Sequence, residues 1–342
     1  MKLLLLLRSS LSSLALAAMI LWGGNAPAET SSASANNLKI DIPYQGIGIG
    51  MAPLWIAIDT GLFRHYGVDA TTELLAQSPT IIASVLSGET LFANVGEDAV
   101  IAADLNGADI VILATGTDKP LFTIQAVSSV HSVAELKGKR LAISQFGTTT
   151  DFIARYVIGK AGLTAGSDVA ILPVGSMESR LSTLSSGATD AAVLGDATIF
   201  KPELVVSFNK IADMLDYDLP FYTTALVAKK SWVDSHRADT LKVVQGYVAG
   251  VAALYTDKKA AIAILAKYAR TADPAALEGA YALALRTQPK IPAPQPGALQ
   301  TGLAMSGLPQ AKHADPTSYI DASFVDTLQR DGFIDRLYKL QE

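Results

Sequence analysis

The residue types that usually carry out chemistry are few and scattered in this sequence. It contains no cysteine, and its four histidines lie far apart, at His65, His131, His236 and His313. No two of them have the spacing of a helical metal-binding pair, and no thiolate can complete a tetrahedral site. We therefore expect no metal centre.

The glycine-rich and serine-rich segments do not match catalytic or cofactor-binding motifs. Gly46–Gly50 (GIGIG) is followed by Met51, where the dinucleotide motif G-x-G-x-x-G requires glycine. Gly175–Ser179 (GSMES) is not the G-x-S-x-G turn of a serine nucleophile. We expect no nucleotide cofactor and no catalytic residues, and interpret Gly46–Gly50 as a flexible turn that either bends or approaches a ligand.

Ser144–Asp151 (SQFGTTTD) is the segment most suited to binding a ligand. It passes from a predicted strand end through glycine into a helix start rich in hydroxyl groups. Free backbone N–H groups and the positive end of the helix dipole meet at such a position. Ordinary N-capping by one threonine explains the same pattern equally well, so both interpretations stay open.

Polar or aromatic residues also follow three other predicted strands. They are Tyr44 with Gln45, Glu97 with Asp98, and Asp196. In parallel sheets, ligands lie beyond the carboxyl ends of the strands, so these side chains could line one cleft. The alternative is that the acids only cap helices.

Strands and helices alternate twice along the chain, and the pattern predicts two α/β units. The first spans the predicted strands from Leu38–Ile42 to Ile110–Ala114, and the second those from Arg140–Ser144 to Asp190–Leu194. Later segments have apolar residues at helical spacing and should cover the first unit. The chain would then cross between the units near 122–127 and 221–227, which predicts a hinge.

Composition and the N-terminus indicate an exported globular protein. The chain has 342 residues, a length typical of two domains. Of these residues, 50% are apolar and 17% charged, as in a globular protein. Residues 1–28 resemble a cleaved signal peptide ending in Ala26-Pro27-Ala28, and 29–36 a disordered leader. An uncleaved membrane anchor is the alternative. The net charge of −5 without a basic cluster argues against nucleic acid, and the lack of cysteine fits a bacterial periplasm.

Several motifs together resemble the periplasmic solute-binding proteins of ABC importers for nitrate, sulfonates, taurine and thiamine pyrimidine precursors. The longest runs from Met51 to Val68 (MAPLWIAIDTGLFRHYGV). Shorter ones follow in the family's order at Asn106–Val111, Leu136–Ala142, Gly187–Ala192 and Phe324–Tyr338, the last resembling the family's closing helix.

The resemblance implies an α/β fold of the type II periplasmic binding protein kind, with two lobes, mainly parallel sheets and a double-crossing hinge. Lobe 1 would comprise residues 37–122 and 224–342, and lobe 2 residues 123–223. The positions of the family's ligand contacts fall on Tyr44, Gln45, Trp55, Glu97, Asp98, Gln145, Phe146, Thr148, Thr149, Asp196 and Tyr222.

The resemblance also implies a function. The chain would be a monomeric periplasmic protein, not an enzyme, that captures a small molecule and delivers it to an inner-membrane ABC permease. The same family includes a fungal pyrimidine synthase, which leaves an enzyme as the alternative, although its cysteine-rich motif is absent here.

The charge of the ligand is open on sequence grounds. The helix start at Thr148–Thr150 suits nitrate or a sulfonate, whereas Glu97, Asp98 and Asp196 favour a neutral or cationic organic molecule. We expect the second.

Overall fold

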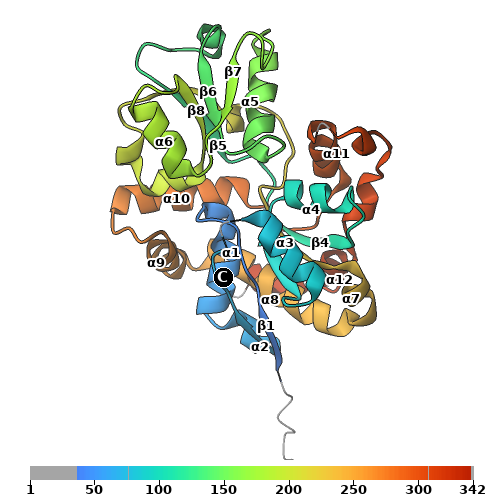
Figure 1. Ribbon diagram of the computed structural model, residues 1–342. Helices are drawn as coiled ribbons and strands as arrows, with labels where there is room; N and C mark the ends of the chain where they lie inside the picture. The colour runs from blue at the N-terminus through green and yellow to red at the C-terminus, as the bar shows by residue number, and fades with distance from the viewer. Residues whose placement is uncertain (1–36, 76, 307, 340–342) are drawn as a thin grey trace, which may run out of the picture. The chain divides into compact units, whose positions relative to one another are not determined.

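The computed structural model describes residues 37–75, 77–306 and 308–339 (Figure 1). The predicted signal peptide and leader, residues 1–36, lie outside the described residues. Within the described part of the chain, no helix is long and apolar enough to cross a membrane.

Five strands form one mixed sheet, and with its helices this sheet is called the smaller lobe. Its strand order is β7-β6-β8-β5-β9. Strands β7, β6 and β8 are parallel, whereas β5 is antiparallel to both β8 and β9. The strands are β5 (Phe122–Ala126), β6 (Arg140–Ile143), β7 (Ala170–Pro173), β8 (Ala191–Gly195) and β9 (Asn209–Asp213).

Helices α5 (Thr149–Lys160) and α6 (Met177–Ser185) cover opposite faces of this sheet. Leu141 and Ile143 pack with residues of α5, whereas Ala142, between them, packs with residues of α6. The alternation follows from the two-residue period of a strand, so both faces of the sheet are buried.

The larger lobe contains two small sheets. β1 (Leu38–Asp41) pairs in parallel with β2 (Val68–Thr71). The second sheet has the order β3-β10-β4, with β10 (Thr224–Lys229) antiparallel to both β3 (Phe92–Val95) and β4 (Ile110–Thr117). Its first helices are α1 (Ala52–Asp59), α2 (Leu62–His65), α3 (Ser78–Ser87) and α4 (Glu97–Asp104).

The later helices belong to the larger lobe. They are α7 (Lys230–Ser235), α8 (Arg237–Thr256), α9 (Lys258–Ala269), α10 (Pro274–Thr287), α11 (Pro296–Met305), α12 (Ser323–Arg330) and α13 (Phe333–Lys339). α8 packs closely on α1, because a Cβ atom at Gly250 would lie 2.2 Å from the carbonyl oxygen of Pro53. Glycine is needed at that crossing.

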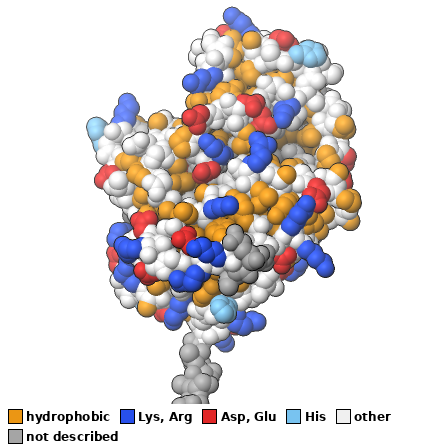
Figure 2. All heavy atoms as spheres, turned by 180° about the vertical axis from the view of Figure 1, so that it is seen from behind, with side chains coloured by type: hydrophobic (Ala, Val, Ile, Leu, Met, Phe, Trp, Pro, Cys, Tyr) orange, Lys and Arg blue, Asp and Glu red, His pale blue; other side chains and the backbone are white. Residues whose placement is uncertain are grey.

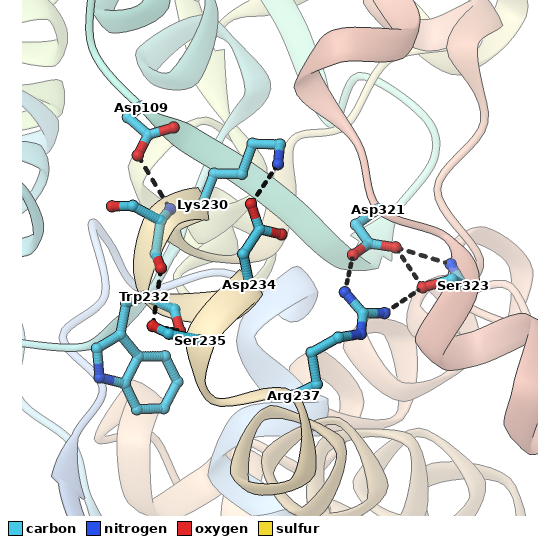
Figure 3. Close-up of polar contacts among 9 residues, drawn as sticks. Asp109, Lys230, Trp232, Asp234, Ser235, Arg237, Asp321 and Ser323 are labelled. Atoms are coloured by element: carbon cyan, nitrogen blue, oxygen red, sulfur yellow. Dashed lines mark hydrogen bonds and ion pairs between the residues drawn. The ribbon is translucent and has the colours of Figure 1, made fainter.

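Polar contacts attach the start of α7 and α8 to neighbouring loops (Figure 3). The Ser231 N–H donates to Asp109 Oδ2 at 2.9 Å, and Arg237 pairs with Asp321 at 3.0 Å. Lys230 pairs with Asp234 at 2.6 Å within α7. The Arg237 guanidinium also donates to Ser323 Oγ. These groups are largely exposed, so each ion pair contributes little to stability. Elsewhere on the surface, acidic and basic side chains are interspersed on the face drawn in Figure 2.

The predicted α/β class is confirmed, with two differences in detail. The sheets are not mainly parallel, because the segments predicted as crossings form antiparallel strands, β5 and β10. The five-stranded sheet is mixed, β3-β10-β4 is antiparallel, and only β1-β2 is wholly parallel. The predicted closing helix at Phe324–Tyr338 is two helices, α12 and α13, separated at Gly332, whose φ of 67° is left-handed.

Candidate functional site: a cavity between the lobes

A cavity of about 1210 Å³ is lined by residues of both lobes. From the larger lobe come the Gly46–Gly48 turn, Gln45, Asp98 and Thr224, and from the crossing segment before β10 comes Thr223. From the smaller lobe come three loops that follow parallel strands, residues 144–150 after β6, 175–180 after β7 and 195–197 after β8, with residues 146 and 179 excepted. Parallel strands end at one edge of a sheet, so these loops meet there.

The loop after β6 is a network of hydroxyl groups. Thr150 Oγ1 accepts a hydrogen bond from the Ser144 backbone N–H at 2.8 Å, and the Ser144 hydroxyl lies 2.9 Å from Thr148 Oγ1. Thr148 Oγ1 donates to the Gln145 carbonyl, and the Thr148 side chain does not cap α5. Ligand binding and N-capping were the two interpretations of Ser144–Asp151, and the structure shows no N-capping by the Thr148 side chain.

At the cavity wall, Gln45 joins two segments of the larger lobe and the crossing segment before β10. Its Oε1 accepts from the Gly96 N–H at 3.1 Å and from the Ser78 hydroxyl at 2.7 Å. Its Nε2 donates to the Thr223 carbonyl at 3.4 Å. Gln45 therefore lines the cavity while its side chain is engaged with the protein.

Asp196 connects the lobes. Its Oδ2 accepts a hydrogen bond from the Ile49 backbone N–H at 2.6 Å. Burial raises the pKa of Asp196 to about 6, against the effect of the N–H groups of Ile49 and of Asp196 itself. A Cβ at Gly48 would lie 2.6 Å from Asp196 Oδ1, so glycine is what admits the carboxylate.

The structure brings six of the predicted site residues to the cavity wall. These are Gln45, Asp98, Gln145, Thr148, Thr149 and Asp196. It places the other five elsewhere, namely Tyr44, Trp55, Glu97, Phe146 and Tyr222.

The aromatic residues of the larger lobe lie in its core instead. Trp55 is fully buried, stacks on Tyr268 with ring centroids 4.6 Å apart, and meets Tyr44 edge to face at 5.6 Å. α1 is buried over residues 52–57, so a bulky side chain at any of these positions packs inward. Phe146 is the opposite case, since 57% of it is exposed.

Glu97 and Tyr222 bind each other rather than the cavity. Glu97 Oε2 accepts from the Tyr222 N–H at 3.0 Å, and the Glu97 N–H donates to the Tyr222 carbonyl. Burial raises the pKa of Glu97 well above its ordinary value, and the charge of Asp98 adds to this. The Tyr222 hydroxyl donates to the Gln295 carbonyl, and burial raises its pKa to about 12. This pair fixes one crossing segment to the start of α4.

Sequence reasoning missed several cavity residues, including Ser144, Thr150, Thr223, Thr224 and Arg180. Thr150 was visible as part of the hydroxyl-rich segment. Arg180 carried no signal, because one arginine on a helix is usually solvated. No group of three potential metal ligands lies together within residues 37–75, 77–306 and 308–339.

Comparisons with known proteins bear on the fold and the family. The NMT1/THI5-like family model matches residues 49–261. A Brucella abortus protein described as a binding protein is 28% identical over 163 residues, which are 47% of this chain and 49% of that protein. The chain therefore spans about half the length of the curated relatives it matches.

Two solved structures are similar to most of the chain. The periplasmic aliphatic sulphonate binding protein SsuA from Escherichia coli matches with a TM-score of 0.67 and 18% identity, over 83% of this chain and 92% of that one. The periplasmic nitrate-binding protein NrtA from Synechocystis matches with a TM-score of 0.69 and 13% identity, over 89% and 92%. At such identities the likeness concerns the fold, and it confirms the predicted periplasmic binding protein fold.

Proposed function

Because this chain belongs to the NMT1/THI5-like family, we propose that it is the solute-binding component of an ABC import system. It captures a small organic molecule in the cavity between its lobes and delivers it to a membrane permease. The observation that carries this proposal is the cavity itself, whose walls come from both lobes. A ligand there touches both lobes at once, which favours a closed form of the protein.

A hinge at the two crossings would allow closure. We propose lobe boundaries at residues 122/123 and 223/224, next to the points where β5 and β10 begin. The Thr223 hydroxyl donates to the Lys119 carbonyl at 2.8 Å and accepts from the Leu121 N–H, so the two crossings are joined. A joined pair of strands bends as one unit, which restricts the motion to opening and closing.

The cavity suits an organic molecule better than an inorganic anion. A volume of about 1210 Å³ far exceeds what nitrate fills. Asp98 and Asp196 line it, and carboxylates at a cavity wall favour ligands with hydrogen-bond donors. The predicted preference for a neutral or cationic group next to Asp196 is retained in this proposal.

We place the mature protein in the periplasm, after removal of residues 1–28, and assign it no enzymatic step. Support comes from the names of the relatives and similar structures, which are binding proteins. Mass spectrometry of the exported chain tests the first point, since a membrane-bound chain that retains Met1 contradicts it. Turnover of a bound compound during long incubation contradicts the second.

A thermal-shift screen tests the binding function directly. A panel of amines, amino acids, aromatic carboxylates, sulfonates, pyrimidines and nitrate is added to the purified mature protein. A ligand at ~100 times its Kd stabilises a one-site protein by about 2.7 kcal/mol. In parallel, protein purified from its native host is denatured and the released small molecules are identified. No stabilisation by any compound, together with no released molecule, overturns the proposed function.

A further inference from the structure

Arg180 is a buried cation at the cavity that forms no ion pair with any described residue. The residue is only 6% exposed and belongs to the cavity lining. One guanidinium nitrogen, Nη1, donates to the Gly175 carbonyl at 2.6 Å, and Nε is buried without a partner. A buried cation ordinarily has a carboxylate partner, because removing a charge from water is costly.

The position of Arg180 on its helix makes the missing counter-ion more significant. Arg180 lies near the start of α6, and its guanidinium folds back to Gly175, just before that helix. Helix N-termini carry partial positive charge, so they favour acidic side chains and disfavour basic ones. Glu178, an exposed residue, is the acid whose charge acts on Arg180, and it forms no hydrogen bond with it.

A second helix start lies beside the first. β6 and β7 are neighbours, and the Gly175 N–H donates to the Ser144 carbonyl at 2.9 Å. The loop after β6 leads into α5, whose start carries no side-chain cap from Thr148. Two helix starts and one guanidinium therefore meet at one end of the cavity. The acids of these two first turns form no ion pair with Arg180, because Asp151 accepts from the Gly147 N–H at 3.0 Å and pairs with Arg155, and Glu178 is exposed.

The cation remains charged at neutral pH. Burial lowers the pKa of Arg180 to about 10, and the charge of Glu178 opposes this shift. A bidentate oxyanion matches the planar fork of a guanidinium, and backbone N–H groups at a helix start add further donors.

We propose that Arg180 binds the oxyanion group, a carboxylate or sulfonate, of the organic solute that this protein carries. The inference rests on the proposed function and names the chemical class of its ligand. In the sheet, β6 lies between β7 and β8, so the loops that lead to Arg180 and Asp196 leave strands that are two spacings apart, roughly 10 Å. The solute then carries an oxyanion at one end and a hydrogen-bond donor, such as an amino group, at the other.

Four probes on one ring test this assignment by isothermal titration of the mature protein. They are aniline, benzoate, 4-aminobenzoate and 4-aminobenzenesulfonate. We expect the two bipolar probes to bind most tightly and aniline most weakly. Arg180→Gln should weaken the three anionic probes by about 10- to 100-fold and leave aniline unchanged. The comparison of 4-aminobenzoate with 4-aminobenzenesulfonate distinguishes the two oxyanions, because these probes differ only in that group.

Arg155→Gln is the matched control. Arg155 is an exposed arginine of the same lobe that pairs with Asp151 at 2.8 Å, and it does not line the cavity. Its replacement removes the same charge and should change no affinity more than about 2-fold. If Arg180→Gln does not fold, Arg180→Lys keeps the charge but loses the fork, and should weaken the anionic probes several-fold with aniline unchanged.

Contrary results separate the inference from the function. Equal loss of affinity in both arginine variants, or none in either Arg180 variant, overturns the role of Arg180. Binding of aniline in preference to the anionic probes does the same and leaves the proposed function intact. If no probe binds, the molecule released from the native protein decides, because one without an oxyanion overturns the inference alone. No released molecule and no stabilising compound overturns both.

Discussion

The two walls of the cavity use their polar groups differently. On the larger lobe, Gln45 has both polar atoms of its side chain engaged with protein, and Glu97 binds through Oε2 to Tyr222 of the crossing segment that packs on this lobe. On the smaller lobe, Arg180 has no counter-ion among the described residues and the Thr148 side chain leaves α5 uncapped. Engaged groups hold a wall rigid, whereas groups without partners gain most from a ligand. We therefore propose that the larger lobe acts as the scaffold and that the smaller lobe supplies the groups that recognise the ligand.

Trp55→Ala gives the largest expected effect and tests the scaffold side of this contrast. Trp55 is fully buried between Tyr44 and Tyr268, so its removal should lower the free energy of unfolding by about 3 to 5 kcal/mol. Urea denaturation measures this, and the protein that stays folded should keep its ligand affinity. Trp232→Ala, at a half-buried tryptophan of the same lobe, should cost less. Normal stability with weakened binding would instead indicate that Trp55 contacts the ligand.

Asp196→Asn tests the acid that connects the walls. Because burial raises the pKa of Asp196 to about 6, the folded state holds a proton that the unfolded chain has released between pH 4 and 6. This group therefore lowers stability as pH rises through that window, and the loss is complete above pH 6. Asparagine still accepts from the Ile49 N–H and carries no charge. The variant should gain about 1 to 3 kcal/mol at pH 7 and show a flatter pH dependence of unfolding between pH 4 and 6.

The same variant should lose ligand affinity although it gains stability. If Asp196 accepts from an amino group of the ligand, Asp196→Asn should weaken an amino ligand by about 1.5 to 3 kcal/mol. Titration calorimetry measures the affinity at pH 7. A variant that is more stable yet binds as tightly as the parent would restrict Asp196 to contacts between the lobes.

Local signals predicted much of this fold. Pro53 in the first turn and Gly61 after the end correctly placed α1, and Gly88 correctly ended α3. The antiparallel entry of β5 and β10 was missed, because it depends on partners far away in sequence, such as Ala225 with Val95. The split at Gly332 was visible as a glycine inside a helical pattern, yet the resemblance to a single closing helix outweighed it.

Part of the site could be predicted for a similar reason. Gln45, Asp98 and Asp196 were singled out because they follow strands, and all three line the cavity. Their contact with a ligand stays a prediction. Trp55 is buried because α1 is enclosed on all sides over residues 52–57, whereas burial of Arg180 depends on how α6 is rotated against its neighbours. Composition reveals neither. Glu97 and Asp98 illustrate the limit, since adjacent residues at a helix start face the protein interior and the cavity respectively.

A pair of threonines sharpens the contrast within the smaller lobe. Thr150 is buried and accepts from the Ser144 N–H, so Thr150→Ala should lower the free energy of unfolding by about 1 to 3 kcal/mol. Thr149 lines the cavity half-buried, and its hydroxyl bonds to no described residue. Thr149→Ala should therefore change stability by less than about 0.5 kcal/mol and weaken the ligand by about 0.5 to 1.5 kcal/mol. Chemical denaturation and calorimetry on both variants provide the data, and identical profiles would remove the distinction.

Phe146→Ala has the smallest expected effect on the fold and asks whether the recognition wall extends beyond the cavity. The ring is 57% exposed, so its loss should change the free energy of unfolding by no more than about 0.5 kcal/mol. Phe146 lies between Gln145 and Gly147, both of which line the cavity. Closure of the lobes on an aromatic ligand would bring the ring onto it, and such a contact contributes about 0.5 to 1.5 kcal/mol. We expect weaker binding of 4-aminobenzoate by that amount, with the ligand-induced decrease in radius of gyration by X-ray scattering preserved. An unchanged affinity would mean that Phe146 stays in solvent and that the recognition wall ends at Gln145.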